Sequence, residues 1–404
     1  MIKVCDSIMG SGKTTAAIRY MNEHPEKKYI YLAPYKSEAD RIQKACPTLR
    51  FKRPTYQVIL HSTELISSGE NIATTHQAFK LYNPEIRRLI KEVGYTLIVD
   101  ESLELLEELE FSIGDLETCV RAGYVKIEDG KVRLVDDSYD GKSSEYKSFF
   151  SVLRCRDLLM FNEGEQGLYY WLLPAELLQA FDDVIVMTYM FEGQEMSGLL
   201  KMEGLEYEYI GLDIDEAGIH FSDSTSYIPE YTKYLKDKIH ILDNARMNAI
   251  GYDEFALSSH WFTRPENDEK VATVRKNLNN YFRNLTESQS SERMWSCYIS
   301  SKMKLRGKGY TNCFVQFNAK SENKYSNKRY LAYLPNIFMN VSRKLYLNSR
   351  GVDINDDVFA LSNMVQWIWR SAIRNGEDVY IYIPSRRMRS LLIGWMNELA
   401  KGGE

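Results

Sequence analysis

The sequence of 404 residues predicts an α/β protein built on parallel β-sheets. Short runs rich in β-branched residues alternate with helical stretches, which is the pattern of strands covered by helices on both faces. A glycine-rich turn joins the first of these runs to the first helix. Polar or acidic residues follow the ends of several runs, and this is the edge at which open α/β sheets bind ligands.

The first half of the chain contains enough strands for one sheet. The apolar runs that predict them lie at residues 2–5, 29–33, 71–74, 96–99 and 184–188. Helices are expected over 14–22 and 37–46. The stretch from about 111 to 170 differs, because Asp-Gly turns at 129–130 and 140–141 interrupt it. We interpret this stretch as an insertion between the fourth and fifth strands.

From about residue 205 the alternating pattern restarts. Candidate strands lie at 314–317, 329–334 and 379–383. A chain of this length is typical of two domains. We therefore predict a first domain over 1–204, which contains the insertion, and a second over 205–404.

Composition narrows the class of protein. Hydrophobic residues make up 44% and charged residues 26%, which is ordinary for a soluble globular chain. The formal net charge of −5 neither favours nor excludes nucleic acid, which would need a local basic surface. The six cysteines are scattered without a Cys-x-x-Cys pair, so neither a zinc site nor a disulfide framework is expected.

The same features predict a cytoplasmic protein. Scattered cysteines fit a reducing compartment. No apolar run approaches the ~20 residues that span a bilayer, so no membrane partner is expected. The glycine-rich turn follows the start of the chain directly and leaves no room for a signal peptide.

The glycine-rich turn has the residues of a phosphate-binding loop. Gly10 and Gly12 allow backbone N–H groups to close on phosphate oxygens, and the following helix adds its N-terminal donors. Lys13 is expected to reach the β and γ phosphates, and the Thr14 hydroxyl to ligate Mg²⁺. Ser7 replaces the first glycine of the usual pattern, and a small residue still allows the turn. The residues expected to bind ATP here are Ser7, Met9, Gly10, Ser11, Gly12, Lys13, Thr14 and Thr15. The alternative is a flexible loop at a helix start.

Two acids, Asp100 and Glu101, end the apolar run 97–99. In a site of this kind the first acid holds Mg²⁺, directly or through water, and the second polarises the attacking water. We therefore predict Thr14 and Asp100 as metal ligands and Glu101 as a catalytic residue. The alternative is a solvated acidic loop. We interpret the further acids Glu104, Glu107, Glu108 and Glu110 as a solvated helix face.

Polar groups also follow three other predicted strands. They are Pro34 and Tyr35, Thr75 and His76, and Thr188 and Tyr189. Each group alone is a weak signal, and a Thr-Thr-His triplet is more often a helix start capped by threonine. Together they place polar side chains at the carboxyl ends of several strands in one sheet.

The segment Gln366–Gly376 predicts a helix in the second half. Arg370 and Arg374 are four residues apart and share a face with Gln366. Arginines aimed at a phosphate neutralise charge that builds in the transition state of phosphoryl transfer. Lys13, Glu101, Arg370 and Arg374 are thus the predicted catalytic residues, and Gln366 is expected to contact the nucleotide. The alternative is a surface helix with two solvated arginines.

The order of these motifs resembles that of superfamily 2 helicases. SIMGSGKT, APY, TTH, VDES, MTY and QWIWRSAIR correspond to motifs I, Ia, Ib, II, III and VI. The motifs resemble in particular those of phage-encoded replication helicases related to herpesvirus-type origin-binding proteins, and the resemblance covers most of the chain. Two departures occur in motif VI. Trp369 replaces the usual glycine, and the second arginine comes one residue later, so either Arg370 or Arg374 is the arginine finger. Residues 350–353 resemble motif V.

The resemblance implies two RecA-like parallel-sheet domains, with an insertion in the first and ATP bound between them. It implies that Pro34, Tyr35, Thr75 and His76 contact nucleic acid. The expected function is an ATP-dependent DNA helicase or translocase of phage replication, acting on single-stranded or forked DNA alongside other replication proteins. Two alternatives stay open. One is an ATP-switched origin-binding or loading factor that does not unwind, and the other is a small-molecule kinase with a P-loop.

Overall fold

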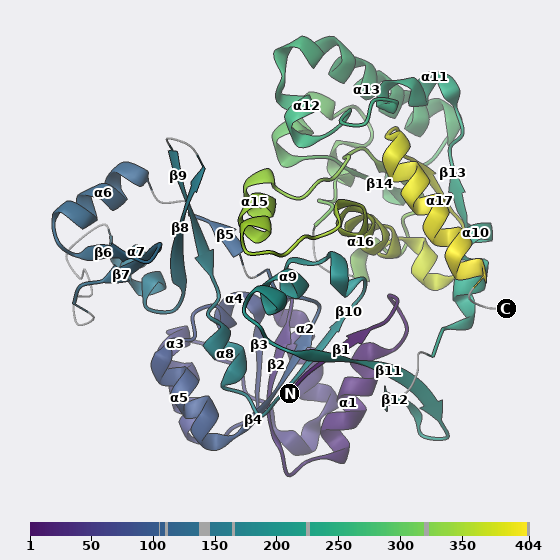
Figure 1. The fold of residues 1–404 in the computed structure, drawn as a ribbon. Helices are drawn as coiled ribbons and strands as arrows, with labels where there is room; N and C mark the ends of the chain where they lie inside the picture. Colours follow the sequence, from purple (N-terminus) through teal and green to yellow (C-terminus); the bar gives the residue numbers. More distant parts are fainter. Residues whose placement is uncertain are drawn as a thin grey trace. The chain divides into compact units, whose positions relative to one another are not determined.

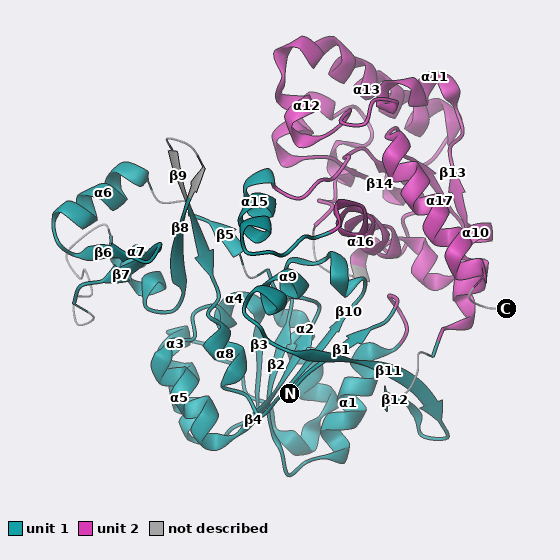
Figure 2. Ribbon diagram, in the orientation of Figure 1, with its two compact units in different colours: residues 1–7, 12–227, 341–354 teal, residues 8–11, 228–340, 355–404 magenta. Residues whose placement is uncertain are grey.

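A computed structural model describes residues 1–104, 106–109, 112–136, 146–163, 166–223, 227–318 and 323–401. The chain forms two compact units (Figure 2). Unit 1 comprises residues 1–7, 12–227 and 341–354, and unit 2 comprises 8–11, 228–340 and 355–404. The described residues between 205 and 227 therefore belong to unit 1, whereas the sequence predicts the start of the second domain at 205. The predicted fold class, α/β with a parallel sheet in each half and an insertion in the first, is confirmed.

The sheet of unit 1 has the strand order β12-β11-β1-β10-β4-β2-β3 (Figure 1). All neighbours pair in parallel except β12 with β11. The strands are β1 (Ile2–Asp6), β2 (Lys28–Ala33), β3 (Ile72–Thr75), β4 (Tyr95–Asp100), β10 (Asp183–Thr188), β11 (Tyr207–Asp215) and β12 (Gly218–Ser222). Register places Asp6 beside Thr188 and Met187 beside Asp100, so the predicted polar strand ends share one edge.

Buried apolar runs explain these strands. Residues 29–33 and 97–99 are fully buried, as parallel strands covered on both faces require. Small and apolar side chains of two helices, Ala16, Ala17, Ala39 and Ile42, pack with Tyr29 and Tyr31 in one core. The helices of the sheet are α1 (Lys13–Glu23), α2 (Lys36–Ala45), α3 (Val58–Ser67), α4 (His76–Phe79), α5 (Pro84–Val93), α8 (Ala175–Gln179) and α9 (Glu195–Met202).

The predicted insertion is a separate antiparallel sheet with the order β5-β9-β8-β7-β6. Its elements are β5 (Leu106–Glu108), α6 (Ile113–Arg121), β6 (Val125–Glu128), β7 (Lys131–Leu134), α7 (Lys147–Leu153), β8 (Asp157–Glu163) and β9 (Gln166–Leu172). The turn at Asp129 and Gly130 joins β6 to β7, with φ of 50° and 71°, as a two-residue hairpin requires. The turn expected at 140–141 lies outside the described residues.

In the described part of the acidic run after Glu101, residues 106–108 form a strand and not the predicted helix, and Glu110 lies outside the described residues. Glu107 lies on β5, where its carboxylate pairs with Lys80 and Arg156, and the latter's Nη1 is 2.5 Å away. Both cations are buried, with side-chain exposures of 4% and 5%. Burial opposes ionisation of Glu107, but the hydrogen bonds from Lys80 and Arg156 outweigh it and lower the pKa of this carboxyl. The single carboxylate therefore pairs with two buried cations at the base of the insertion.

Replacing Glu107 by glutamine should destabilise the protein by about 3 kcal/mol, because two buried cations lose their counter-charge. Urea unfolding followed by circular dichroism measures this. Folding lowers the pKa of Glu107, so the ion pairs stabilise the wild type fully above the ordinary carboxyl pKa of 4.5. This stabilisation is lost as the pH falls from 4.5 through the folded-state pKa. The variant should lack that acid dependence. Glu128→Gln, which removes an exposed pair with Lys126 on the same sheet, should change stability by less than ~0.5 kcal/mol.

Unit 2 contains a parallel sheet of order β13-β16-β15-β14. Its elements are α10 (Leu235–Lys238), β13 (Ile239–Ile241), α11 (Ala245–Asn248), α12 (Ser259–Thr263), α13 (Asp268–Asn280), β14 (Arg293–Ser296), α14 (Lys302–Leu305), β15 (Tyr330–Tyr333), α16 (Asp356–Trp369), β16 (Val379–Tyr382) and α17 (Arg386–Lys401). The strands predicted at 329–334 and 379–383 are present.

The strand predicted at 314–317 is wrong, since only Phe314 makes a single bridge, to Trp295. The true neighbour, β14, begins with a buried arginine. Arg293 donates to the Ser288 hydroxyl at 2.9 Å and to the Phe282 carbonyl at 2.6 Å. A charged residue at the start of a four-residue strand hides it from an apolar pattern.

A segment late in the chain, residues 341–354, completes unit 1. It contains α15 (Val341–Ser349). Arg343 pairs with the buried Glu195 on α9 at 2.7 Å, and the Tyr346 ring lies 5.8 Å from Phe161 and 6.2 Å from Tyr170. A Cβ on Gly198 would lie 2.8 Å from Ile354, so the segment packs closely on α9.

Candidate nucleotide-binding and hydrolysis site

The glycine-rich loop runs from the end of β1 to the start of α1 at Lys13. Gly10 and Gly12 have φ of 80° and 96°, which side chains rarely adopt. A Cβ on Gly12 would also lie 2.4 Å from Ile219. The Lys13 ammonium donates to the Ser7 carbonyl within the same loop. The loop therefore has the backbone conformation and the cation that phosphate binding needs.

Carboxylates surround Lys13. Burial lowers the pKa of its ammonium, and the nearby Cys5, Asp100, Asp6 and Glu101 counter this effect. Asp6 was not predicted as a site residue. Its carboxylate accepts hydrogen bonds from the backbone N–H groups of Met190 at 2.7 Å and Phe191 at 3.0 Å. It thereby fixes the turn after β10 beside the loop.

Asp100 receives three polar groups at the end of β4. Its Oδ2 accepts from the Tyr31 hydroxyl at 2.6 Å and from the Thr14 hydroxyl at 3.3 Å. The His76 imidazole lies 2.9 Å from the Asp100 carbonyl oxygen. Burial raises the pKa of the Asp100 carboxyl, and the Tyr31 hydrogen bond and the Lys13 charge counter it. Thr14 and Asp100 are thus adjacent, as a shared metal would require.

Glu101 has an uncommon backbone conformation. Its φ is 63°, in the left-handed region, and its N–H donates to the Met187 carbonyl at 3.0 Å. Such a conformation in a residue other than glycine costs about 1–3 kcal/mol and is concentrated at functional sites. The conformation turns the chain sharply after Asp100 while leaving both acids at the strand end.

The residues expected to contact nucleic acid occupy neighbouring strand ends. Pro34 and Tyr35 follow β2 and are partly buried. Thr75 caps α4, its hydroxyl accepting from the Ala78 N–H at 3.3 Å, which is the helix-start alternative noted for this triplet. His76 is buried. Glu38 on α2 was not predicted, and burial followed by the charges of Asp100 and Glu101 raises its pKa to about 8.

The predicted helix over 366–376 is interrupted in unit 2. Helix α16 ends at Trp369, and Arg370 is its C-terminal cap. Ser371 has ψ of −169°, and its hydroxyl donates to the Ile368 carbonyl at 2.6 Å, which closes the helix. Arg374 lies in the following 3₁₀ turn, so the shared face expected for the two arginines is wrong. Arg370 is buried, 3.5 Å from the Phe317 carbonyl, and Gln366 donates to the Ser362 hydroxyl at 3.2 Å.

Trp369, which departs from the helicase pattern, packs beside Tyr231 with ring centroids 5.0 Å apart. The Tyr231 hydroxyl donates to the Met9 carbonyl. A Cβ on Gly10 would lie 2.4 Å from the Trp369 ring. The tryptophan therefore occupies space that a side chain at Gly10 would need.

Comparison with known proteins places the chain in a family. It is 36% identical over 413 residues to the SPbeta prophage-derived uncharacterized protein YonV of Bacillus subtilis (strain 168), covering 98% of both chains. The chain belongs to the YonV family. Residues 233–396 match the family described as YonV C-terminal Rossmann-like domain, which corresponds to most of unit 2.

Solved structures of helicases are similar to the chain in fold. An apo form of XPD is 14% identical with a TM-score of 0.49, over 97% of this chain and 95% of that chain. A second XPD helicase structure is 11% identical with a TM-score of 0.49, over 99% and 95%. S. tokodaii Xpd4 is 13% identical with a TM-score of 0.48, over 98% and 93%.

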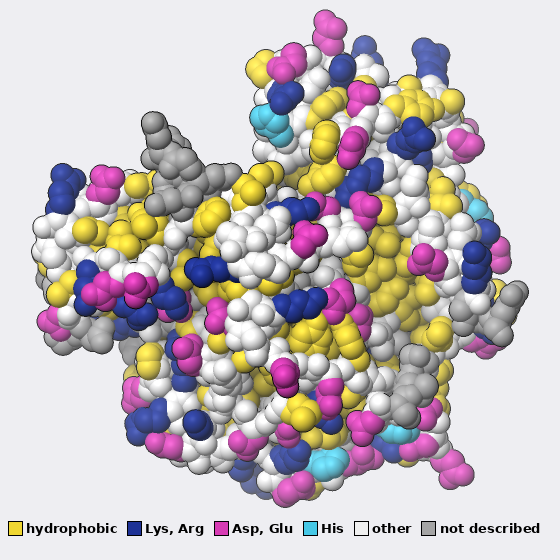
Figure 3. All heavy atoms as spheres, in the orientation of Figure 1, with side chains coloured by type: hydrophobic (Ala, Val, Ile, Leu, Met, Phe, Trp, Pro, Cys, Tyr) yellow, Lys and Arg dark blue, Asp and Glu magenta, His cyan; other side chains and the backbone are white. Residues whose placement is uncertain are grey.

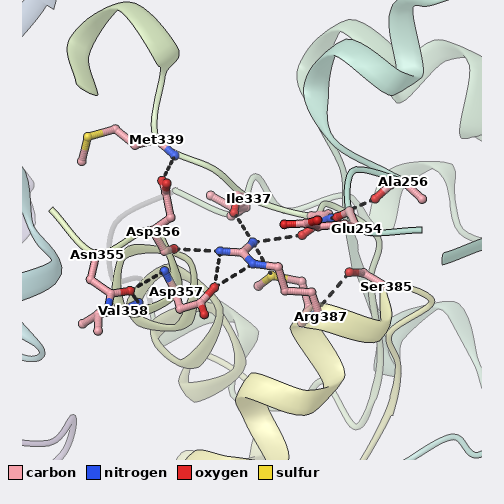
Figure 4. Close-up of polar contacts among 12 residues, drawn as sticks. Glu254, Ala256, Ile337, Met339, Asn355, Asp356, Asp357, Val358, Ser385 and Arg387 are labelled. Carbon is pink, nitrogen blue, oxygen red and sulfur yellow. Dashed lines mark hydrogen bonds and ion pairs between the residues drawn. The ribbon is translucent and has the colours of Figure 1, made fainter. Parts of the chain in front are cut away.

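Within the YonV C-terminal domain, two of the three arginines at the start of α17 make hydrogen bonds within the fold. Arg387 donates to the Asp357 carboxylate at 2.7 Å and to the Ile337 carbonyl at 2.7 Å (Figure 4). Arg389 donates to the Ile383 and Pro384 carbonyls. Arg386 is exposed. Of the three arginines at the start of α17, Arg386 is therefore the most open to solvent.

Among the described residues, no three His, Cys, Asp or Glu side chains are grouped to hold a metal ion. Mg²⁺ in nucleotide sites is held by one or two protein ligands together with phosphate oxygens, so Thr14 and Asp100 fit that role.

No helix in the described part of this YonV-family chain is long and apolar enough to cross a membrane.

Proposed function

We propose that this chain hydrolyses ATP and couples the hydrolysis to movement on nucleic acid. One observation supports this most directly. The glycine loop and the acid pair, 86 residues apart in sequence, meet at one sheet edge with Thr14 3.3 Å from Asp100. A loop for phosphates beside two strand-end carboxylates is the arrangement that triphosphate hydrolysis needs. A small-molecule kinase needs neither the acid pair nor a second α/β unit.

Each residue then has a defined role. The loop N–H groups and Lys13 bind the β and γ phosphates, which neutralises their charge. Thr14 and Asp100 hold Mg²⁺, which when bound supplies further positive charge to the phosphates. Glu101 orients a water molecule and accepts its proton. In unit 2, Arg374 is the better candidate for the arginine finger, because it is more exposed than Arg370.

Nucleic acid is the proposed partner, as single-stranded or forked DNA. Pro34 and Tyr35 follow β2, and Thr75 ends the neighbouring β3 at the same edge as the acids. We propose that these residues contact the nucleic-acid backbone. Basic and acidic side chains intermix on the face shown in Figure 3. A face with mixed charges is consistent with a protein that contacts only a few phosphates of the nucleic acid.

The biological setting is proposed from the relative and the motif order. The YonV relative is prophage-derived, and the motifs resemble those of phage replication helicases related to herpesvirus-type origin-binding proteins. We propose a role in phage DNA replication in the host cytoplasm, together with other replication proteins.

Two assays on the full-length protein test the proposal. Phosphate release from ATP should rise when single-stranded DNA is added, and rise less with duplex DNA or RNA. Displacement of a labelled strand from a fork should follow. Stimulated hydrolysis without displacement would instead support an ATP-switched loading factor. Absence of hydrolysis under all three conditions would overturn the proposal.

A further inference from the structure

We propose that Tyr31 is a positioning residue for Asp100, which orients the metal-binding carboxylate from a neighbouring strand. The inference rests on the proposed function, because it assumes that Asp100 serves Mg²⁺. No helicase motif quoted above includes Tyr31. It lies on β2, two residues before the end of the strand at Ala33.

The sheet topology brings Tyr31 to the acid. β2 and β4 are neighbours although 61 residues separate the end of one from the start of the other, and Tyr31 pairs in register with Ile98. The phenol is fully buried and extends toward the strand end, where its hydroxyl lies 2.6 Å from Asp100 Oδ2. This distance is typical of a strong hydrogen bond from a hydroxyl to an ionised carboxylate.

The hydrogen bond from Tyr31 to Asp100 affects which of the two carboxylate oxygens is left to bind a cation. Among the described residues, the side chains that donate to Asp100 are Tyr31 and Thr14, and both donate to Oδ2. Oδ1 is therefore the oxygen available to a metal ion or its water. If the Thr14 hydroxyl were to bind the metal instead, the Tyr31 hydroxyl would still donate to Oδ2. The carboxylate would therefore keep its orientation.

If the Tyr31 hydroxyl needed only a partner for burial, any hydrogen-bond acceptor would serve. Another tyrosine on the same strand allows this purely structural role to be tested. Tyr29 is two residues earlier on β2, on the same face, and is also fully buried. Its hydroxyl donates to the His24 carbonyl at 2.9 Å, away from the acid pair. Tyr29→Phe and Tyr31→Phe are therefore matched substitutions that remove one buried hydroxyl each.

The test measures divalent-cation binding rather than turnover. Binding of a fluorescent ADP analogue to each full-length variant is titrated with Mg²⁺, and bound Mn²⁺ is measured independently by electron paramagnetic resonance. Outer contacts to metal ligands typically change metal affinity 10- to 100-fold. We expect Tyr31→Phe to raise the Mg²⁺ midpoint about tenfold, with nucleotide binding in EDTA unchanged. Tyr29→Phe should match the wild type in both.

The outcomes separate this inference from the proposed function. Equal Mg²⁺ midpoints for the two variants would overturn the positioning role, while the wild type's Mg²⁺-dependent nucleotide binding would leave the proposed function standing. A wild type without such binding would overturn both. Thermal unfolding should show similar losses in the two variants. In an Asp100→Asn background, Tyr31→Phe should add no further shift, because the carboxylate through which it acts is gone.

Discussion

Lys13→Ala should abolish ATP hydrolysis, with steady-state phosphate release falling at least ~10³-fold. One lost charge-stabilising donor in a water-excluded site typically costs 10²–10³-fold, and the loop ammonium serves two phosphates at once. Lys13 is also the cation that the loop brings near the acid pair. Burial lowers the pKa of its ammonium, and the charges of Asp100 and Glu101 raise it. Phosphate release and nucleotide binding should be measured on the same preparation.

Lys27→Ala is the control for loss of a lysine in the same unit. Lys27 donates to the Tyr20 hydroxyl at 2.9 Å and to Asp183 at 3.4 Å, at the opposite end of the strands. Its variant should hydrolyse ATP at the wild-type rate. Hydrolysis that survives in Lys13→Ala would contradict the phosphate-loop assignment.

Glu101→Gln should bind ATP with nearly unchanged affinity yet turn over about 10²–10⁴-fold more slowly. A positioned general base contributes a factor of this size, and an amide of the same shape cannot accept the proton. Single-turnover phosphate release separates the chemical step from binding. Normal turnover would mean that another residue positions the water.

Glu38 is the acid most suited as a control, since it lies near both acids and has a pKa of about 8. Burial is the main cause of this raised pKa and favours the neutral carboxyl, which glutamine imitates, so Glu38→Gln should change turnover little. Glu101→Gly adds a second contrast. It should lose hydrolysis as well, but gain up to about 1 kcal/mol of stability because the left-handed φ of 63° no longer carries a side chain.

The parts of the site that sequence predicts are those formed by contiguous residues. The loop from Ser7 to Thr15 and the pair Asp100 and Glu101 each follow a buried strand, so local pattern is enough to place them. The helix containing Gln366 is predicted to continue to Gly376, whereas α16 ends at Trp369 because Ser371 closes it through its own backbone conformation and hydroxyl.

Contacts between strands were beyond prediction because they depend on strand order. Tyr31 reaches the site from β2, Asp6 from β1, and His76 from the start of α4 directly after β3. Nothing in the sequence states that β2 lies beside β4 or that β1 lies beside β10. Glu107 shows the same limit. The sequence predicts that an acid within an acidic run is solvated, and only the fold places Lys80 and Arg156 beside Glu107.

The late segment 341–354 sets the order in which the protein can be completed during synthesis. A nascent chain that has emerged as far as Tyr227 contains every strand of the unit 1 sheet, yet its Glu195 has no Arg343 and its Tyr170 has no Tyr346 to pack against. Domains commonly fold one after another from the N-terminus as they leave the ribosome. Here unit 1 reaches its final packing only after most of unit 2 has been translated, so neither half can be produced intact by cutting the gene once.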